Sequence, residues 1–143
     1  MGLAAVSTDD YESSCRAVNQ SYGRVVTQDA LIKTFYEKFV RSSSHVAAKF
    51  SNTDFDKQYE MLDQSLTMAL LFSQGNMIAA RTMDRIRESH NRHNLKISPE
   101  FYDLWINSLI EAIAELDSEF TPVLEGQWRT VMQKALDHIK GGY

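Results

Sequence analysis

The sequence predicts an all-α fold with about seven helices. Apolar residues recur at steps of three and four along most of the chain, and no segment alternates apolar and polar residues convincingly. Each of the two prolines follows a residue that can cap a helix, so both are expected to begin helices. Without strands, the apolar faces can be buried only by packing helices across one another.

One domain is expected over residues 1–143, in which residues 1–26 form an N-terminal extension and a first helix. The chain is 43% hydrophobic and 24% charged, which is the composition of an ordinary globular domain with enough apolar side chain for a core. Internal repeats and low-complexity stretches are absent. A second domain therefore does not fit.

The first helix is predicted to be capped within residues 7–10 and to run through Tyr11, Cys15 and Val18, ending near Gly23. Cys15 is the single cysteine, so the chain can form no internal disulfide and suits a reducing cytoplasm. We expect its thiol to be a small buried hydrophobe and assign it no function.

The next helix can be capped by Thr27 and should fray at the serine run 42–44. Its apolar stripe consists of Leu31, Ile32, Phe35, Tyr36 and Phe39. A short helix or turn then leads to Phe50.

Asp54 and Asp56 suit the start of the following helix, because carboxylates are favourable at the positive end of a helix dipole. Gly75 is a natural stop for it. The apolar positions between them are Leu62, Leu66 and Ala69. The helix after Gly75 is expected to end at His90.

Two long helices close the chain, beginning at Pro99 after Ser98 and at Pro122 after Thr121. The first carries the apolar stripe Phe101, Leu104, Trp105, Ser108, Leu109, Ala112, Ile113 and Leu116. The second carries Val123, Leu124, Val131, Ala135 and Ile139.

Charge and hydropathy exclude two kinds of partner. The formal net charge of -4 and the scattered acidic residues give no attraction to phosphate backbones, so nucleic-acid binding is disfavoured. The longest apolar run, 68–72, is too short to span a bilayer, and the first residues lack a basic leader. We expect a soluble cytoplasmic protein.

His90 is the most informative residue for function, because it continues an apolar helical stripe and should point inward. The stripe is Ala79, Met83, Ile86 and His90. A buried imidazole needs a partner, and a backbone carbonyl is the ordinary one. A metal is the alternative.

The histidines of the chain do not suit a chelated zinc ion. They are His45, His90, His93 and His138. No pair has the four-residue spacing of the zinc-protease helix, and one cysteine cannot supply a thiolate site. Haem iron fits better, since the porphyrin supplies four ligands and the protein need add only one imidazole. His90 is then the first candidate ligand and His93 the second.

A set of residues in order and spacing resembles a bacterial single-domain globin from about Thr27 to the C-terminus. The set is Phe35-Tyr36-Glu37-Lys38-Phe39, Phe50, Gln58, Leu62, His90, Pro99-Glu100-Phe101-Tyr102 and Trp128. The resemblance implies a single globin domain whose helices pack around a pocket for haem b (iron protoporphyrin IX).

Tyr36 and Phe50 are similar to residues of flavohaemoglobin globin domains, in which the tyrosine enters the distal pocket and the phenylalanine packs on the haem. Gln58 and Leu62 match the distal glutamine and leucine of that family. On their residue types alone, Tyr36 could equally be a core tyrosine and Gln58 a solvated helix residue. A shifted register would bring in Tyr59, Glu60 or Gln64, and Phe55 could replace Phe50.

The segment from His90 to Trp105 is similar to a group of short proteobacterial globins with a longer connection between the proximal histidine and a Pro-Glu-x-Tyr helix start. This resemblance favours His90 over His93 as the iron ligand. The second ring nitrogen of His90 should then bond a carbonyl near Ile86 or Arg87. The apolar pocket would be walled by Leu62, Leu66, Ile86, Leu104 and Leu109.

The last helix shows no clear counterpart to the carboxylate that, with a tyrosine, makes the proximal histidine of flavohaemoglobins more anionic. Tyr102 supplies the tyrosine, but without the carboxylate the resemblance does not extend to strong peroxidase-like activation of the iron.

The resemblance implies reversible binding of a diatomic gas, with oxygen first and nitric oxide second. Bound oxygen carries partial negative charge, so hydrogen bonds from Tyr36 and Gln58 would favour its retention. Turnover as a nitric oxide dioxygenase would need an external reductase, because the chain has no room for a flavin or nicotinamide domain. The alternative from another class is a haem-free globin-like module for protein contacts or sensing.

Overall fold

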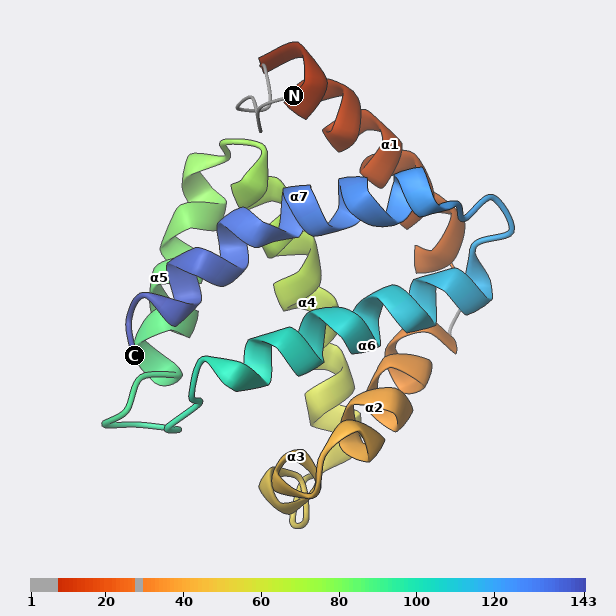
Figure 1. The fold of residues 1–143 in the computed structure, drawn as a ribbon. Coiled ribbons are helices and arrows are strands. Elements are labelled where there is room, and N and C mark those ends of the chain that lie inside the picture. The colour runs from red at the N-terminus through yellow and green to blue at the C-terminus, as the bar shows by residue number, and fades with distance from the viewer. Residues whose placement is uncertain (1–7, 28–29) are drawn as a thin grey trace, which may run out of the picture.

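The computed structural model describes residues 8–27 and 30–143, and within these ranges the chain forms seven α-helices and no strand (Figure 1). The helices are α1 (Thr8–Val26), α2 (Ala30–Ser42), α3 (Ser44–Lys49), α4 (Phe55–Ser73), α5 (Met77–Ser89), α6 (Glu100–Leu116) and α7 (Pro122–Lys140). The predicted all-α class with about seven helices is confirmed.

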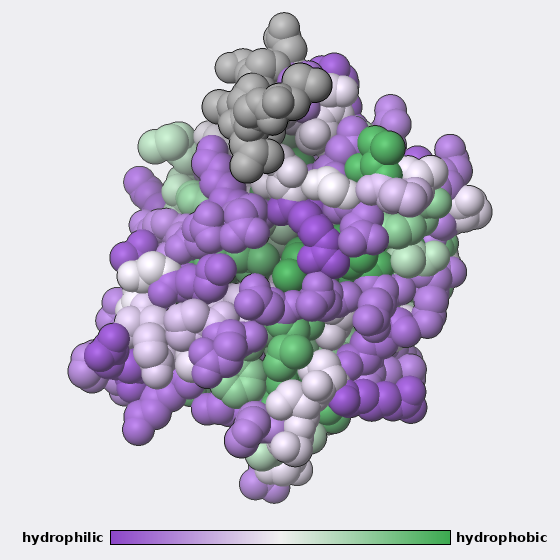
Figure 2. Space-filling view, viewed as in Figure 1, coloured by the Kyte–Doolittle hydropathy of each residue, from purple (hydrophilic) through white to green (hydrophobic). Residues whose placement is uncertain are grey.

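The helices cross one another around one core. α6 and α7 run across α4, which lies behind both in Figure 1. α1 packs on α7, α2 packs on α6, and α5 packs against both α4 and α7. On the face shown in Figure 2, polar residues cover most of the surface, and apolar atoms are visible between them near its middle.

Several predicted helix ends are confirmed by their capping bonds. α2 ends at Ser42, and the Ser43 side chain accepts a hydrogen bond from the backbone N–H of His45 at the start of α3. The Asp54 carboxylate likewise accepts from the backbone N–H groups of Asp56 and Lys57 in the first turn of α4. Gly75, after the end of that helix, has a φ of +90°, a conformation that favours glycine.

α7 begins as predicted and α6 begins one residue later than predicted. The Thr121 side chain accepts from the N–H of Leu124, and Pro122 is the first residue of α7. Pro99 instead precedes α6, with helical dihedrals and no side-chain capping bond. The prediction that Val123 lies on the apolar face of α7 is wrong: its side chain lies in the first turn of the helix and is 71% exposed.

The predicted end of α1 near Gly23 is wrong, because the helix continues to Val26. A glycine inside a helix costs about 0.5–1 kcal/mol. Two contacts offset this cost: Val25 is fully buried, and the Tyr22 hydroxyl hydrogen-bonds that of Thr67 on α4 at 2.9 Å. Ser7 and residues 28–29 lie outside the described residues, as does the capping predicted for Thr27.

A buried polar network ties α1 to α7 and to the end of α6. The indole N–H of Trp128 donates to the Ser21 hydroxyl at 2.9 Å, which donates to the Asp117 carboxylate at 2.6 Å. Arg24 donates twice to the same carboxylate, at 2.7 and 2.9 Å. Burial alone would raise the pKa of Asp117, but the hydrogen bonds from Arg24 and Ser21 outweigh it and hold that pKa at about 2.

Among the described residues, no helix has both the length and the apolar content needed to cross a membrane.

Candidate functional site

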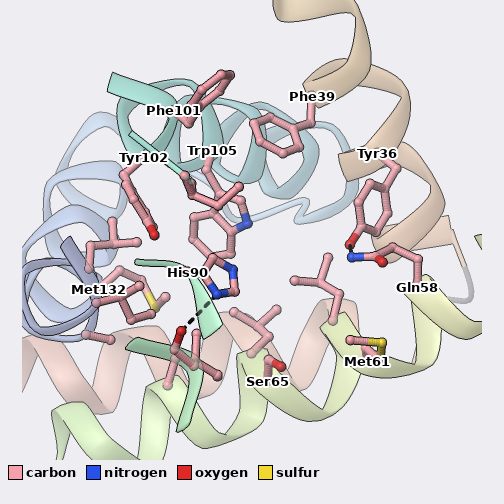
Figure 3. A pocket seen from close by; sticks show the side chains of 18 of the residues that line it. Tyr36, Phe39, Gln58, Met61, Ser65, His90, Phe101, Tyr102, Trp105 and Met132 are labelled. Atoms are coloured by element: carbon pink, nitrogen blue, oxygen red, sulfur yellow. Dashed lines mark hydrogen bonds between the residues drawn. The ribbon is translucent and has the colours of Figure 1, made fainter. Parts of the chain in front are cut away.

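A cavity lies between α2, α3, α4, α5, α6 and α7 (Figure 3). Its volume is about 200 Å³, whereas a buried water needs only about 10–15 Å³, so it can accept a sizeable group. Most lining side chains are apolar. They are Phe39, Val46, Phe50, Met61, Leu62, Leu66, Ala69, Met83, Ile86, Ile97, Phe101, Trp105, Met132, Ala135, Leu136 and Ile139, with Tyr36, Lys49, Gln58, Ser65, His90 and Tyr102.

One side of the cavity carries a hydrogen-bonded pair from two helices. Tyr36 comes from α2 and is 4% exposed, and the side-chain amide of Gln58 on α4 donates to its hydroxyl at 2.9 Å (Figure 3). Because Gln58 occupies a lone pair of the oxygen, the phenol proton is left for another acceptor. We call this the distal side of the cavity.

Burial raises the pKa of Tyr36 to about 12, although the hydrogen bond from Gln58 acts in the opposite direction. The phenol is therefore protonated at neutral pH and remains a donor. Four aromatic neighbours hold its ring, with centroids 5.0 Å away for Phe35, 5.6 Å for Phe50 and Tyr59, and 5.9 Å for Phe55.

His90 also faces the cavity, at a place separate from Tyr36 and Gln58 (Figure 3). α5 ends at Ser89, one residue before the predicted end, and His90 is its C-cap residue; the Nδ1 of His90 lies 2.9 Å from the Ile86 carbonyl and 2.9 Å from the Ser89 hydroxyl. A carbonyl only accepts, so Nδ1 carries the proton and Nε2 presents a lone pair. Among the described residues, Nε2 has no hydrogen-bond partner.

Burial lowers the pKa of His90, and the hydrogen bond to the Ile86 carbonyl offsets this only in part. The ring is therefore a neutral imidazole at neutral pH, which is the form that binds a metal. The predicted hydrogen bond to a carbonyl one turn back is confirmed, with Ile86 as the partner.

The other three histidines lie elsewhere. His93 is exposed in the turn after α5, and His45 is exposed on α3. His138 is 2.7 Å from the carboxylate of Asp84, on the α5–α7 contact. In the described part of the chain, no three His, Cys, Asp or Glu side chains gather where they could hold a metal ion together.

Most of the predicted pocket residues line the cavity. Besides His90, Tyr36 and Gln58, these are Phe50, Leu62, Leu66, Ile86 and Tyr102. Leu104 and Leu109 do not line it: Leu109 is buried in the core, and Leu104 is partly buried against that core. Trp105 lines it instead, because successive residues of a helix are rotated by about 100°.

The alternatives to the distal pair lie outside the cavity lining. Tyr59 and Phe55 pack around the ring of Tyr36, and neither lines the cavity. Glu60 and Gln64 are exposed on α4.

Sequence reasoning missed Met61 and Ser65 on α4 and Lys49 at the end of α3. Counting in steps of three and four from Gln58 would have found the first two, because they share its helix face. No spacing pattern in the sequence indicates that Lys49 lines the cavity. Its ammonium group donates to the Leu95 carbonyl at 3.2 Å and so bridges α3 to the segment after α5.

Tyr102 lies on the side of the cavity that holds His90 and Met132 (Figure 3). The side chain is 6% exposed, burial raises its pKa, and its hydroxyl has no hydrogen bond to another described residue. The side chains that α7 contributes to the lining are all apolar: Met132, Ala135, Leu136 and Ile139. α7 therefore contributes no carboxylate to the lining of the cavity.

Comparison with solved structures finds a similar protein. It is a protein from Pseudomonas aeruginosa PAO1, described as structurally highly homologous to a human haemoglobin. The two chains are 32% identical, the match covers 91% of this chain and 98% of the other, and the TM-score is 0.86. No protein-family model and no curated protein matches the chain.

Proposed function

Because the chain belongs to the globin family, we propose that it binds haem b and, through the haem, a diatomic gas, with oxygen first and nitric oxide second. The observation that carries the proposal is the state of His90. This neutral imidazole is oriented by its Nδ1–H bond to Ile86, with the Nε2 lone pair free in an apolar cavity.

The remaining lining residues fit the same group. A porphyrin is a flat apolar ring with carboxylates on one edge, and the cavity is apolar with one cationic side chain, Lys49, among its lining residues. Phe50 presents an aromatic ring for stacking. When bound, haem would supply an iron able to bind the gas, and His90 would hold that iron through its Nε2 atom.

The distal side would hold the gas. Tyr36 would donate a hydrogen bond to the gas from a phenol that stays protonated, and Gln58, which donates to the same hydroxyl oxygen, would keep the hydroxyl oriented. The pair would correspond to the flavohaemoglobin-type arrangement that the sequence resemblance implies, and it would favour retention of the gas over rapid release. We propose storage or sensing of the gas rather than its rapid delivery.

The histidine side supports reversible binding over peroxidase-like chemistry. The partners of the Nδ1 atom of His90 are the neutral Ile86 carbonyl and Ser89 hydroxyl, and α7 contributes only apolar side chains to the cavity lining. An anionic partner would be needed to make the imidazole more basic.

An optical spectrum of the chain expressed with sufficient haem tests the proposal. We expect a Soret band in the wild type and in His93→Ala, and its loss or a marked shift in His90→Ala. His93 is a matched control because it is exposed and lies three residues further along. A wild type without a Soret band would favour the haem-free module, and loss of haem in His93→Ala alone would overturn His90 as the ligand.

A further inference from the structure

Arg87 joins the end of α7 to the end of α5, one turn before His90. Its guanidinium donates from Nη1 to the His138 carbonyl at 3.2 Å and from Nη2 to the Gly141 carbonyl at 3.1 Å. The last carbonyls of a helix have no partner within the helix and lie at its negative end. A cation that donates to two carbonyls there therefore binds α5 to α7.

Gly142 lies directly against the stem of Arg87. A Cβ atom at position 142 would collide with Arg87 Cγ and would lie 3.0 Å from its Nε. Contacts this short do not occur without movement, and Cγ is close to the backbone of Arg87 rather than at the flexible end of the side chain. Glycine is thus needed here for the close approach, not for its backbone dihedrals.

Arg92 makes a second attachment, two residues after His90. Its Nε donates to the Tyr143 carbonyl at 2.6 Å, and its guanidinium carbon lies 5.0 Å from the centre of the Tyr143 ring, within cation–π range. We name the set of Arg87, Arg92 and residues 141–143 the arginine clasp.

The clasp is continuous with the wall of the cavity. Ile86, beside Arg87, and Ile139, next to His138, both line the cavity. The Ile86 carbonyl also holds the ring of His90. Movement of the end of α5 relative to α7 would therefore move His90 relative to the cavity wall.

We propose that the arginine clasp positions His90: Arg87 and Arg92 are positioning residues that set the imidazole against the cavity. The inference rests on the proposed function, because the position of the His90 ring affects gas binding only if His90 is the iron ligand. It goes further by assigning a role to the residues beyond α7, none of which lines the cavity.

Hydrogen exchange on the full chain without haem gives the first test. The amide of His90 bonds the Ile86 carbonyl, and the amide of Ile97 bonds the His90 carbonyl. In Arg87→Ala we expect both amides to exchange roughly tenfold faster, as the loss of charged hydrogen bonds predicts. Arg87→Lys should restore part of the protection.

Arg85→Ala is the matched control. Arg85 is on the same helix, is exposed, and bonds Thr82 one turn back. It should leave exchange at His90 unchanged. Gly142→Ala keeps Arg87 but displaces its stem, so it should speed exchange less than Arg87→Ala does. If Arg87→Ala does not fold, Gly142→Ala provides the test in its place.

Resonance Raman spectroscopy of the ferrous, haem-loaded protein gives the second test. We expect the iron–histidine stretching band to move in Arg87→Ala, to return toward its wild-type place in Arg87→Lys, and to stay unmoved in Arg85→Ala. A role in stability alone would lower the melting temperature without moving this band. Unchanged exchange at His90 in both Arg87→Ala and Gly142→Ala, or an unmoved band, would overturn the proposal.

Failure of the proposed function would look different. A wild type that takes up no haem would remove the gas-binding proposal, whereas the exchange comparison on the haem-free chain would still show whether the clasp holds His90.

Discussion

Gln58 on α4 donates a 2.9 Å hydrogen bond to the hydroxyl of Tyr36 on α2, although 22 positions separate the two residues. The bond makes the pair a single unit: Gln58 sets the orientation of the hydroxyl, and Tyr36 keeps a proton to donate into the cavity. Because burial keeps the phenol neutral, the unit remains a donor far above neutral pH.

Tyr36→Phe should therefore speed dissociation of oxygen from the haem-loaded protein by several-fold to roughly tenfold, the kinetic equivalent of one lost hydrogen bond. Gln58→Leu should have a smaller effect in the same direction, because the tyrosine donor remains. Stopped-flow displacement measures both rates. Tyr59→Phe is the control, since Tyr59 packs on the ring of Tyr36 without lining the cavity. Wild-type rates in both test variants would remove the distal assignment.

Asp117 should make the protein sensitive to acid. Its pKa is about 2 in the folded chain and near 3.8 when unfolded, so its ionised form contributes stability above pH 4. That contribution, about 2 kcal/mol, is lost as the pH falls from about 4 to about 2. Urea unfolding at each pH should show this loss in the wild type and not in Asp117→Asn. Parallel pH curves for the two proteins would contradict the prediction.

Ser21→Ala should lower the free energy of unfolding by about 1–3 kcal/mol, because it leaves both the Trp128 indole and the Asp117 carboxylate short of a partner. The measurement is the midpoint of urea unfolding at constant m-value. Ser13→Ala, at an exposed position of the same helix, should change stability by less than about 0.5 kcal/mol. An equal loss in both variants would show that the network is not the cause.

Two glycine substitutions should act in opposite directions. Gly23 lies inside α1, and a Cβ atom added there would meet nothing within 4 Å, so Gly23→Ala should stabilise the chain by about 0.5–1 kcal/mol. Gly75 has a φ of +90°, so Gly75→Ala should destabilise it by about 1–2 kcal/mol. Thermal unfolding of the two variants checks the signs, and the same sign in both would contradict this prediction.

Helix boundaries were predictable where the signal is local. Asp54, Thr121 and Gly75 act through bonds or dihedrals within a few residues, and all three mark helix ends in the structure. The helix end predicted at Gly23 is wrong, because contacts of α1 with other helices outweigh the free-energy cost of a glycine within the helix. α6 begins at Glu100, one residue after the predicted start at Pro99, because its first turn is a tight one in which the Tyr102 N–H donates to the Pro99 carbonyl.

The cavity residues were predictable in part. His90 and Ile86 followed from spacing on one helix, and Tyr36 and Gln58 from family resemblance. The sequence predicts Leu104 in the cavity wall, whereas the structure places Trp105 there. The stripe of α6 is apolar on both sides, so spacing alone does not show which side meets the cavity.

The all-α class, most helix ends and the inward face that carries His90 are predictable from the sequence, because these features depend on residues within a few positions of one another. Three relationships are visible only in the folded chain: Gln58 bonds Tyr36, His93 lies in solvent, and Arg87 holds the end of α7. These relationships join residues far apart in the chain, and they form only where the crossing of the helices brings their side chains into contact.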